Sequence, residues 1–243
     1  MAHIDTSAHL NRWRNKSLAE KALLSIGMLL IAVCVPSWPA ALLVAALMIG
    51  VTIFGAGVPF KLWWSVMTAP ISFLFLGVAT VLFQFHGWHV SLAPHGLETG
   101  GRLAARAFAG LNCLIFLSLT TPATDLVAGL RRIGVPAEIA EMTLLMYRFV
   151  FLLLDTADNM NAAQAARLGH SNYKRHMNSL SLLITNLIPR AFSRAQALEV
   201  GLAARGWSGE LRVLSTVQPA STAGLGVIFA AEVAVLVFGW FTT

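Results

Sequence analysis

Five apolar runs, each with ~20 residues and almost no charge, constrain this chain more than any other feature of its sequence. They cover residues 18–35, 40–57, 65–85, 103–119 and 220–241. A helix that crosses the hydrocarbon core of a bilayer needs about 20 such residues. Only 12% of the residues are charged, against about 25% in soluble domains, so a soluble fold could not cover these runs with polar surface. The sequence therefore predicts an all-α integral membrane protein with about five transmembrane helices.

The basic residues predict how these helices are oriented. Of the 17 lysines and arginines, four lie before or at the start of the first run, Lys61 lies between the second and third runs, and ten lie between Arg131 and Arg212. Only Arg102 and Arg106 lie near the other face. Because Lys and Arg are enriched in cytoplasmic loops, we expect a cytoplasmic N-terminus, a cytoplasmic central region and an outside C-terminus. The net charge of +6 then favours membrane lipid or an acidic protein as a partner, and no nucleic acid.

The central region, residues 121–218, regains polar residues but keeps a helical period. Pro136 is typical of a helix start, and no helix-breaking residue follows it until Gly169. A second helical segment covers about residues 174–205. We therefore expect two long helices on the cytoplasmic side, in addition to the transmembrane helices.

Both long helices are predicted to end in the same way, with an arginine next to small residues. The first ends with Ala166, Arg167 and Leu168, and the second ends with Ala204, Arg205 and Gly206. Alanine lets another surface come close, and a guanidinium can bind a carboxylate through two hydrogen bonds. An arginine at this position can also offset the negative end of the helix dipole or contact a lipid phosphate. Two copies 38 residues apart favour docking to a partner with two equivalent sites.

Several short segments along the chain form one ordered set of motifs. They are Ile4-Asp5 with Asn11-Arg12, Ala19-Glu20-Lys21, Pro36-Ser37-Trp38, Leu119-Thr120-Thr121-Pro122 with Asp125-Leu126, Tyr147-Arg148-Phe149 with Leu153-Leu154-Asp155, 164–169, and Ala204-Arg205-Gly206 with Gly209-Glu210-Leu211-Arg212. This set resembles the T component of energy-coupling-factor (ECF) transporters, their transmembrane coupling subunit. The resemblance covers nearly the whole chain and is closest to the cobalt-type branch, CbiQ.

The resemblance implies a set of partners and a division of the chain. Arg167 and Arg205 are expected to sit in grooves of two ATP-binding-cassette ATPase subunits, while the hydrophobic helices hold a substrate-binding S component similar to CbiM. A small accessory membrane subunit is a further expected partner. The implied parts are N-terminal transmembrane helices (1–120), a coupling-helix region (121–218) and a C-terminal transmembrane helix (219–243). Cobalt uptake across the cell inner membrane is the implied function, with nickel or another ECF substrate as the alternative.

Other functional classes need features that the sequence lacks. An ATPase needs the phosphate loop Gly-x-x-x-x-Gly-Lys-Ser/Thr, which does not occur. A membrane prenyltransferase needs two acidic clusters for its magnesium ions, whereas Asp155 and Asp158 form one. A self-contained permease needs polar residues along a path through the spans, where Asn112, Glu232 and a few Ser and Thr are available. We therefore expect a protein without catalytic residues and without a cofactor.

Two charged residues are candidates for contacts with other subunits. Glu232 lies about ten residues into the last apolar run, where a carboxylate is costly unless it is neutralised or paired. It is either protonated or hydrogen-bonded inside the protein, or it contacts another subunit. Arg194, in the second long helix, is the other candidate.

No metal site is expected. His86, His89 and His95 recur in the loop between the third and fourth runs, and imidazole binds late first-row divalent ions. Histidines at a membrane interface are, however, more often interfacial side chains than ligands. Cys34 and Cys113 lie in apolar runs without metal-ligand spacing, so a disulfide framework is not expected either.

Overall fold

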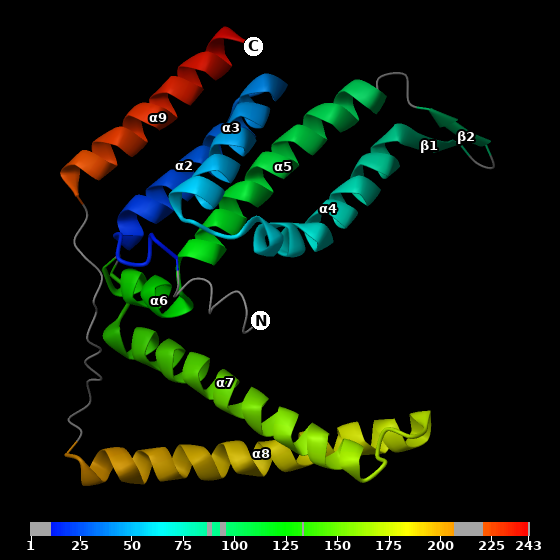
Figure 1. Cartoon of the computed structure of the whole chain (residues 1–243), viewed down its shortest axis with the longest axis vertical. Coiled ribbons are helices and arrows are strands. Elements are labelled where there is room, and N and C mark those ends of the chain that lie inside the picture. The colour runs from blue at the N-terminus through cyan, green and yellow to red at the C-terminus, as the bar shows by residue number, and fades with distance from the viewer. Residues whose placement is uncertain (1–10, 87–88, 93–95, 133, 207–220, 243) are drawn as a thin grey trace. The chain divides into compact units, whose positions relative to one another are not determined.

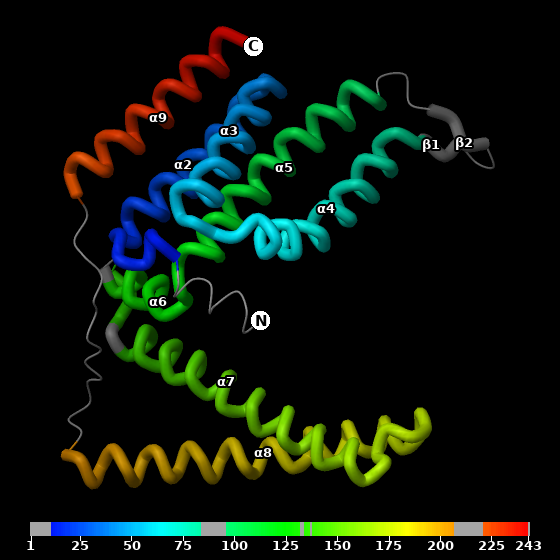
Figure 2. Tube along the Cα trace, viewed as in Figure 1, coloured from blue at the N-terminus to red at the C-terminus, as the bar shows by residue number. Residues whose placement is uncertain are grey.

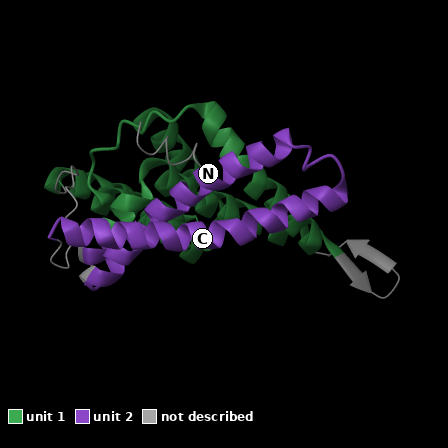
Figure 3. Cartoon of the chain, turned by 90° about the horizontal axis from the view of Figure 1, so that it is seen from below, with its two compact units in different colours: residues 1–129, 215–243 green, residues 130–214 purple. Residues whose placement is uncertain are grey.

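The structure is a computed structural model that describes residues 11–86, 89–92, 96–132, 134–206 and 221–242. It contains two compact units, which Figure 3 shows in different colours. The first combines Met1–Gly129 with Ser215–Thr243, and the second is Leu130–Leu214. The apolar helices lie in the first unit, and the two long helices of the central region lie in the second.

The helices of the first unit follow the predicted apolar runs. In chain order they are α2 (Leu18–Cys34), α3 (Trp38–Gly50), the π-helix η1 (Val51–Gly55), α4 (Phe60–Leu82), α5 (Gly96–Thr120), α6 (Ala123–Arg132), which continues into the second unit, and α9 (Thr222–Phe241) (Figure 1). Four stretches of the described residues are long and apolar enough to cross a membrane: Trp38–Gly55, Phe60–Leu82, Gly96–Thr120 and Thr222–Phe241. Helix α2, with 17 residues, is shorter. The predicted all-α membrane fold is confirmed.

Helices α2, α3, α5 and α9 lie side by side and form the core of this unit (Figure 2). Met28 on α2, Val44 on α3 and Ala109 on α5 are almost completely buried where these helices meet. A Cβ atom at Gly110 on α5 would lie 3.1 Å from Cδ1 of Leu29 on α2. Such small residues allow close van der Waals contact, which holds helices together where lipid weakens the hydrophobic effect.

Buried polar contacts join α2 to α5 and α9. The Nζ atom of Lys21, which is 1% exposed, donates a hydrogen bond to the carbonyl oxygen of Thr120 at 3.0 Å. The backbone N–H of Ser221, just before α9, donates to Oε1 of Glu20 at 2.8 Å. Both contacts satisfy backbone groups at helix ends, which would otherwise remain without partners. Helix ends far apart in the sequence are therefore held together by two adjacent residues of α2.

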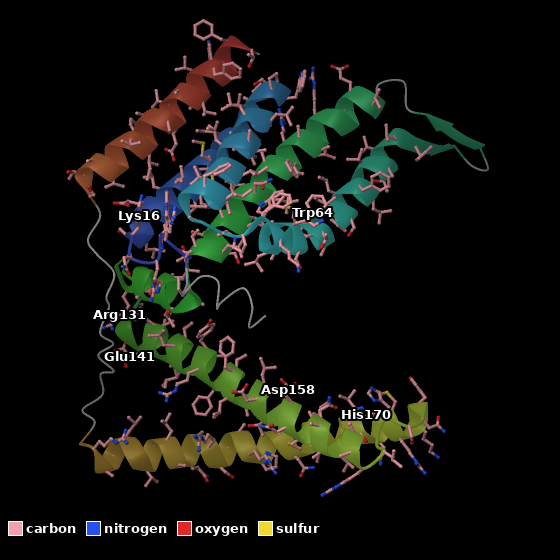
Figure 4. All side chains as sticks on the ribbon, viewed as in Figure 1. Lys16, Trp64, Arg131, Glu141, Asp158 and His170 are labelled. Atoms are coloured by element: carbon pink, nitrogen blue, oxygen red, sulfur yellow. The ribbon has the colours of Figure 1, made fainter. Side chains whose placement is uncertain are left out.

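The segment that precedes α2 also contacts other helices. Arg14 forms an ion pair with Asp125 on α6. The ring of Trp13 packs edge-on against that of Phe116 on α5, with 5.5 Å between the ring centroids. The Nζ atom of Lys16, which Figure 4 labels, lies 3.9 Å from the centroid of the Trp13 ring. These contacts connect the start of the described chain to α5 and α6.

A β-hairpin occupies part of the predicted loop between the third and fourth apolar runs. Strand β1 (Phe83–His86) pairs antiparallel with β2 (His89–Leu92), and His86 is opposite His89. The third apolar run, predicted to reach residue 85, is therefore helical only to Leu82. Alternation of aromatic and polar residues in Phe-Gln-Phe-His is typical of a strand. His95 lies outside the described residues.

Two long helices make up most of the second unit. Helix α7 (Ala137–Ala166) has 30 residues and α8 (Tyr173–Ala204) has 32, so they are about 45 and 48 Å long. Pro136 directly precedes α7, as predicted, and α8 continues through Pro189. The two helices pack against each other and are joined by a short turn. This turn and the far end of α8 carry the two predicted arginine motifs.

Candidate functional site

Arg167 and Arg205 end the two long helices with the same backbone geometry. Arg167 follows α7 with φ −91° and ψ 17°, and Arg205 follows α8 with φ −93° and ψ 9°. The N–H of Arg167 donates to the carbonyl of Gln164, and that of Arg205 donates to the carbonyl of Leu202, both at 3.1 Å. The two sequence motifs are therefore one structural element that occurs twice.

The residue after each arginine has a left-handed backbone conformation. Gly206 has φ +68°, which glycine adopts without strain, whereas Leu168 has φ +60°. This conformation costs a residue with a side chain about 1 to 2 kcal/mol. The N–H of Leu168 donates to the carbonyl of Ala165 at 3.0 Å, which satisfies one of the free carbonyls at the helix end. The first helix thus ends on a left-handed leucine, not on the glycine that the sequence indicates.

Gly169 instead permits close contact between the turn and α8. Its N–H donates to the carbonyl of Gln164 at 2.9 Å, and its carbonyl accepts a hydrogen bond from Oγ of Ser179 at 3.2 Å. A Cβ atom at Gly169 would lie 2.5 Å from that Oγ and 2.9 Å from the Gln164 oxygen. Since neither distance leaves room for a side chain, a glycine is needed here. The turn that carries Arg167 is thereby fixed against α8.

A groove of about 440 Å³ lies beside Arg167 and is lined by both helices. Helix α7 contributes Gln164, and α8 contributes Asn186 and Arg190. The Oε1 atom of Gln164 is buried and has no hydrogen-bond partner among the described residues. This groove, called the Arg167 groove below, combines two guanidinium groups with two amide side chains.

A second groove, of about 390 Å³, lies beside Arg205. Its charged lining residues are Arg148 and Asp155 on α7, Arg194 on α8, and Arg205 itself. Leucine side chains and Phe149 form its apolar walls. The structure thus brings the predicted contact residue Arg194 together with Arg205 in one site, called the Arg205 groove below.

The arginine side chains of both grooves are exposed, and they outnumber the acidic side chains among the described lining residues. Within the described ranges, no salt bridge or side-chain hydrogen bond involves Arg148, Arg167, Arg190, Arg194 or Arg205. Among the described residues, two arginines line the Arg167 groove, and three arginines and one aspartate line the Arg205 groove, so these residues give each groove two net positive charges. Guanidinium groups without partners bind carboxylates or phosphates strongly. The sequence indicates the two helix-end arginines and Arg194, but not Arg148 or Arg190, which share their grooves.

Glu232, the other predicted contact residue, lies in the first unit. It is half-buried on α9, and its Oε1 atom is shielded from solvent without a hydrogen-bond partner among the described residues. The Nε atom of Arg106 on α5 is also buried without a hydrogen-bond partner among the described residues. Buried polar atoms in membrane-spanning helices indicate a structural or functional contact.

The acidic and histidine residues considered for metal binding are distributed over several elements. Asp155 and Asp158 lie on α7, and Figure 4 labels Asp158. In the part of the chain that the structure describes, no three His, Cys, Asp or Glu side chains lie close enough to hold a metal ion. His170 and His176 contact each other at the turn between α7 and α8, with 4.8 Å between their ring centroids. This contact depends on how the turn folds, and the sequence alone does not predict it.

The chain is similar in sequence to known proteins over nearly its whole length. The family described as "Cobalt transport protein", CbiQ, matches residues 10–215 of the chain. The cobalt transport protein CbiQ of Rhodobacter capsulatus is 47% identical over 239 residues, which cover 98% of this chain and 98% of that protein. The match therefore includes both long helices and the transmembrane helices.

More distant relatives carry related names. The energy-coupling factor transporter transmembrane protein EcfT of Brevibacillus brevis is 32% identical over 179 residues, or 68% of this chain and 66% of that protein. A protein of Methanocorpusculum labreanum described as a fused cobalt transport protein CbiMQ is 28% identical over 218 residues, or 85% of this chain and 36% of that protein. With its apolar helices and its two arginine-ended helices, the chain belongs to the CbiQ family of cobalt transport proteins, which are membrane components of transporters and not enzymes.

Proposed function

We propose that this chain is the T component of an ECF transporter for cobalt uptake. It transmits ATP-driven movement of two ATP-binding-cassette subunits to a membrane-embedded S component that binds the substrate. The observation that carries this proposal is the repeated helix end, in which Arg167 and Arg205 have the same backbone geometry and each lines a positively charged groove. Two equivalent docking elements suit a partner that is itself a pair of subunits.

In this mechanism the ATPase subunits move the ends of α7 and α8. Arg167 and Arg205 end different helices, so ATP-driven movement of the two ATPases shifts α7 and α8 relative to each other. Two arrangements of α7 and α8 are in equilibrium in this mechanism. ATP shifts that equilibrium only as far as the closed ATPase pair binds one arrangement more tightly than the other. The rearrangement then reaches the S component, which it moves or releases.

The surface of α7 supports contact with a partner inside or beside the membrane. Its residues Ile139, Met142, Met146, Val150 and Leu154 are between 46% and 69% exposed and recur every three or four positions. An apolar stripe of this kind needs a protein or lipid partner to remain stable. The S component and membrane lipid are the proposed partners, and a small accessory membrane subunit completes the complex.

The names of the relatives support the choice of ion and of S component. The relative from Rhodobacter capsulatus is a cobalt transport protein, and the fused relative carries the names CbiM and CbiQ together. A CbiM-like S component is therefore the proposed partner, with nickel as the alternative ion. The basic residues of the sequence support insertion in the inner membrane with the N-terminus in the cytoplasm.

Co-purification from the native membrane tests this function. The full chain is tagged, extracted with mild detergent, and every associated protein is identified by mass spectrometry. We expect ATP-binding-cassette subunits and one S component, in a complex that takes up cobalt after reconstitution with ATP. Isolation of the chain without any ATPase, from membranes that transport cobalt, would contradict the proposal.

A further inference from the structure

Each helix-end arginine shares its groove with a second arginine from the middle of α8. Arg190 lies with Arg167 in one groove, and Arg194 lies with Arg205 in the other. We infer that Arg190 and Arg194 are additional docking residues, and that each groove binds a carboxylate side chain of an ATPase subunit between two guanidinium groups. This inference rests on the proposed function and specifies which further residues hold the partner and which chemistry they recognise.

No acidic residue is among the described residues that line the Arg167 groove. Its other polar lining residues are Gln164, Ser179 and Asn186. The Nδ2 atom of Asn186 already donates to the carbonyl of Leu182 at 2.7 Å, so this amide is oriented by its own helix. Arg190 is exposed and retains its five N–H donors. An incoming carboxylate therefore meets donors from both walls of the groove.

The Arg205 groove has the same net charge but a different composition. Asp155 balances one of its three arginines, and no ion pair within the described residues engages Arg194. Two grooves with equal net charge and different neighbours can bind similar acidic side chains on two ATPase subunits. Because each groove has one wall from α7 and one from α8, a carboxylate held by both walls also fixes the position of one helix relative to the other.

The spacing of the two arginines is unfavourable unless an anion binds nearby. Arg190 and Arg194 are four residues apart on α8, so their side chains start on the same side of the helix. Like charges at this spacing destabilise an isolated helix. The sequence contains no acidic residue between Asp158 and Glu199. Among the described residues that line the two grooves, Asp155 in the Arg205 groove is the one acidic side chain. A bound carboxylate removes this repulsion.

The shape of the grooves favours a protein side chain over a lipid headgroup. Each groove has a volume of roughly 400 Å³ and includes apolar walls, such as Met160 in one and Leu198 in the other. The methylene groups of a glutamate or aspartate can pack against such walls while its carboxylate reaches the guanidinium groups. Binding to anionic lipid is the competing outcome that the experiment below separates.

Binding measurements with the full chain in detergent test this inference. The probe is the ATPase pair purified from the wild-type complex, and its dissociation constant is measured for Arg190→Ala, Arg194→Ala and the corresponding lysine variants. We expect each alanine variant to weaken binding by roughly tenfold, the loss of one charge-assisted hydrogen bond, and each lysine variant to weaken it less. Arg175→Ala is the matched control, since Arg175 also lies on α8 but bonds to Oγ of Ser171 outside both grooves.

Two further measurements distinguish docking from a structural or lipid-binding role. If Arg167 and Arg190 hold the same carboxylate, the double alanine variant should lose less affinity than the product of the two single losses. Helix content and melting temperature should not change, because both side chains are exposed. Wild-type affinity in Arg190→Ala and Arg194→Ala, with weaker binding in Arg167→Ala, would overturn this inference and leave the proposed function intact. Loss of binding to phosphatidylglycerol vesicles alone would also overturn it, whereas wild-type affinity after loss of both Arg167 and Arg205 would contradict the proposed function itself.

Discussion

The carboxyl group of Glu232 on α9 fills the space beside Gly27 on α2. A Cβ atom at Gly27 would lie 2.9 Å from Oε2 of Glu232 and closer still to Oε1. The glycine therefore provides the room that the carboxyl group occupies between two helices of the first unit. Because Oε1 is buried, any residue that replaces Glu232 must be uncharged or find a partner in the same narrow space.

Glu232→Gln should preserve this packing, since glutamine has nearly the same shape and carries no charge. Glu232→Lys should lower expression and assembly strongly, because a longer ammonium group would face the α2 backbone in an apolar environment. Yield of monodisperse protein and its melting temperature in detergent measure the difference. Equal yield and assembly of both variants would show that the site faces water or lipid headgroups.

Lys21→Ala should destabilise the first unit. The change removes the hydrogen bond to the carbonyl of Thr120 and leaves a cavity at a position that is 1% exposed, for a loss of about 2 to 5 kcal/mol. Thermal unfolding of the purified variant measures the effect. Lys16→Ala is the control, because the Lys16 side chain contacts Trp13 through a cation–π interaction, worth about 0.5 to 1 kcal/mol. Equal shifts in both variants would contradict the role assigned to Lys21.

Removal of Arg167 or Arg205 should weaken the association with the ATPases, and removal of both should abolish it. Loss of one partly buried charge-assisted contact costs about 2 to 5 kcal/mol at that site. The remaining contact still benefits from a high effective concentration, because both sites belong to one chain. Pull-down of the ATPases, with ATP hydrolysis and transport measured in parallel, tests this expectation. A double alanine variant that binds and transports normally would refute the docking role.

The proposed orientation can be tested by labelling single cysteines in intact cells. Ser171→Cys, in the turn between α7 and α8, should be protected from a membrane-impermeant reagent. Leu97→Cys, at the start of α5, should be accessible, since Leu97 is 81% exposed while the neighbouring Gly96 is buried. Both variants also carry Cys34→Ser and Cys113→Ser, so that the introduced cysteine is the one that reacts. Labelling of Ser171→Cys but not of Leu97→Cys would show that the chain has the opposite orientation in the membrane.

Replacement of His86, His89 and His95 by alanine should leave cobalt uptake largely unchanged. The first two histidines belong to a β-hairpin, in which His86 is opposite His89, and the substrate ion is expected in the S component. Uptake of radioactive cobalt at matched expression measures the effect. A substantial loss of uptake would assign direct handling of the metal ion to this hairpin.

Much of the fold follows from the sequence, because the physical requirements are local. A helix that spans a bilayer needs a continuous apolar run, so the runs predict α2, α3, α4, α5 and α9 to within a few residues at most ends. The exception at α5 is informative. This helix begins at Gly96, several residues before the apolar run, since a helix can continue through polar residues outside the hydrocarbon.

Contacts that depend on distant segments could not be predicted in this way. Glu20 and Ser221 are 201 residues apart, and their hydrogen bond exists only because α2 and α9 pack together. Pairing of Phe83–His86 with His89–Leu92 takes the place of a predicted helix end and loop, because a strand forms only where a second segment is available to pair with it.

The sequence by itself determined the membrane class, the two long helices and the arginine that ends each of them, because apolar length, helical period and a repeated motif are all local properties. Only the tertiary structure decided which residues share a site with those arginines. Arg190 lies 23 residues from Arg167 and joins it in a groove because α7 and α8 fold back on each other. Arg194 and Arg205 lie 11 residues apart along α8, and α7 supplies the opposite wall of their groove. A groove needs two walls, and here the second wall comes from a different helix.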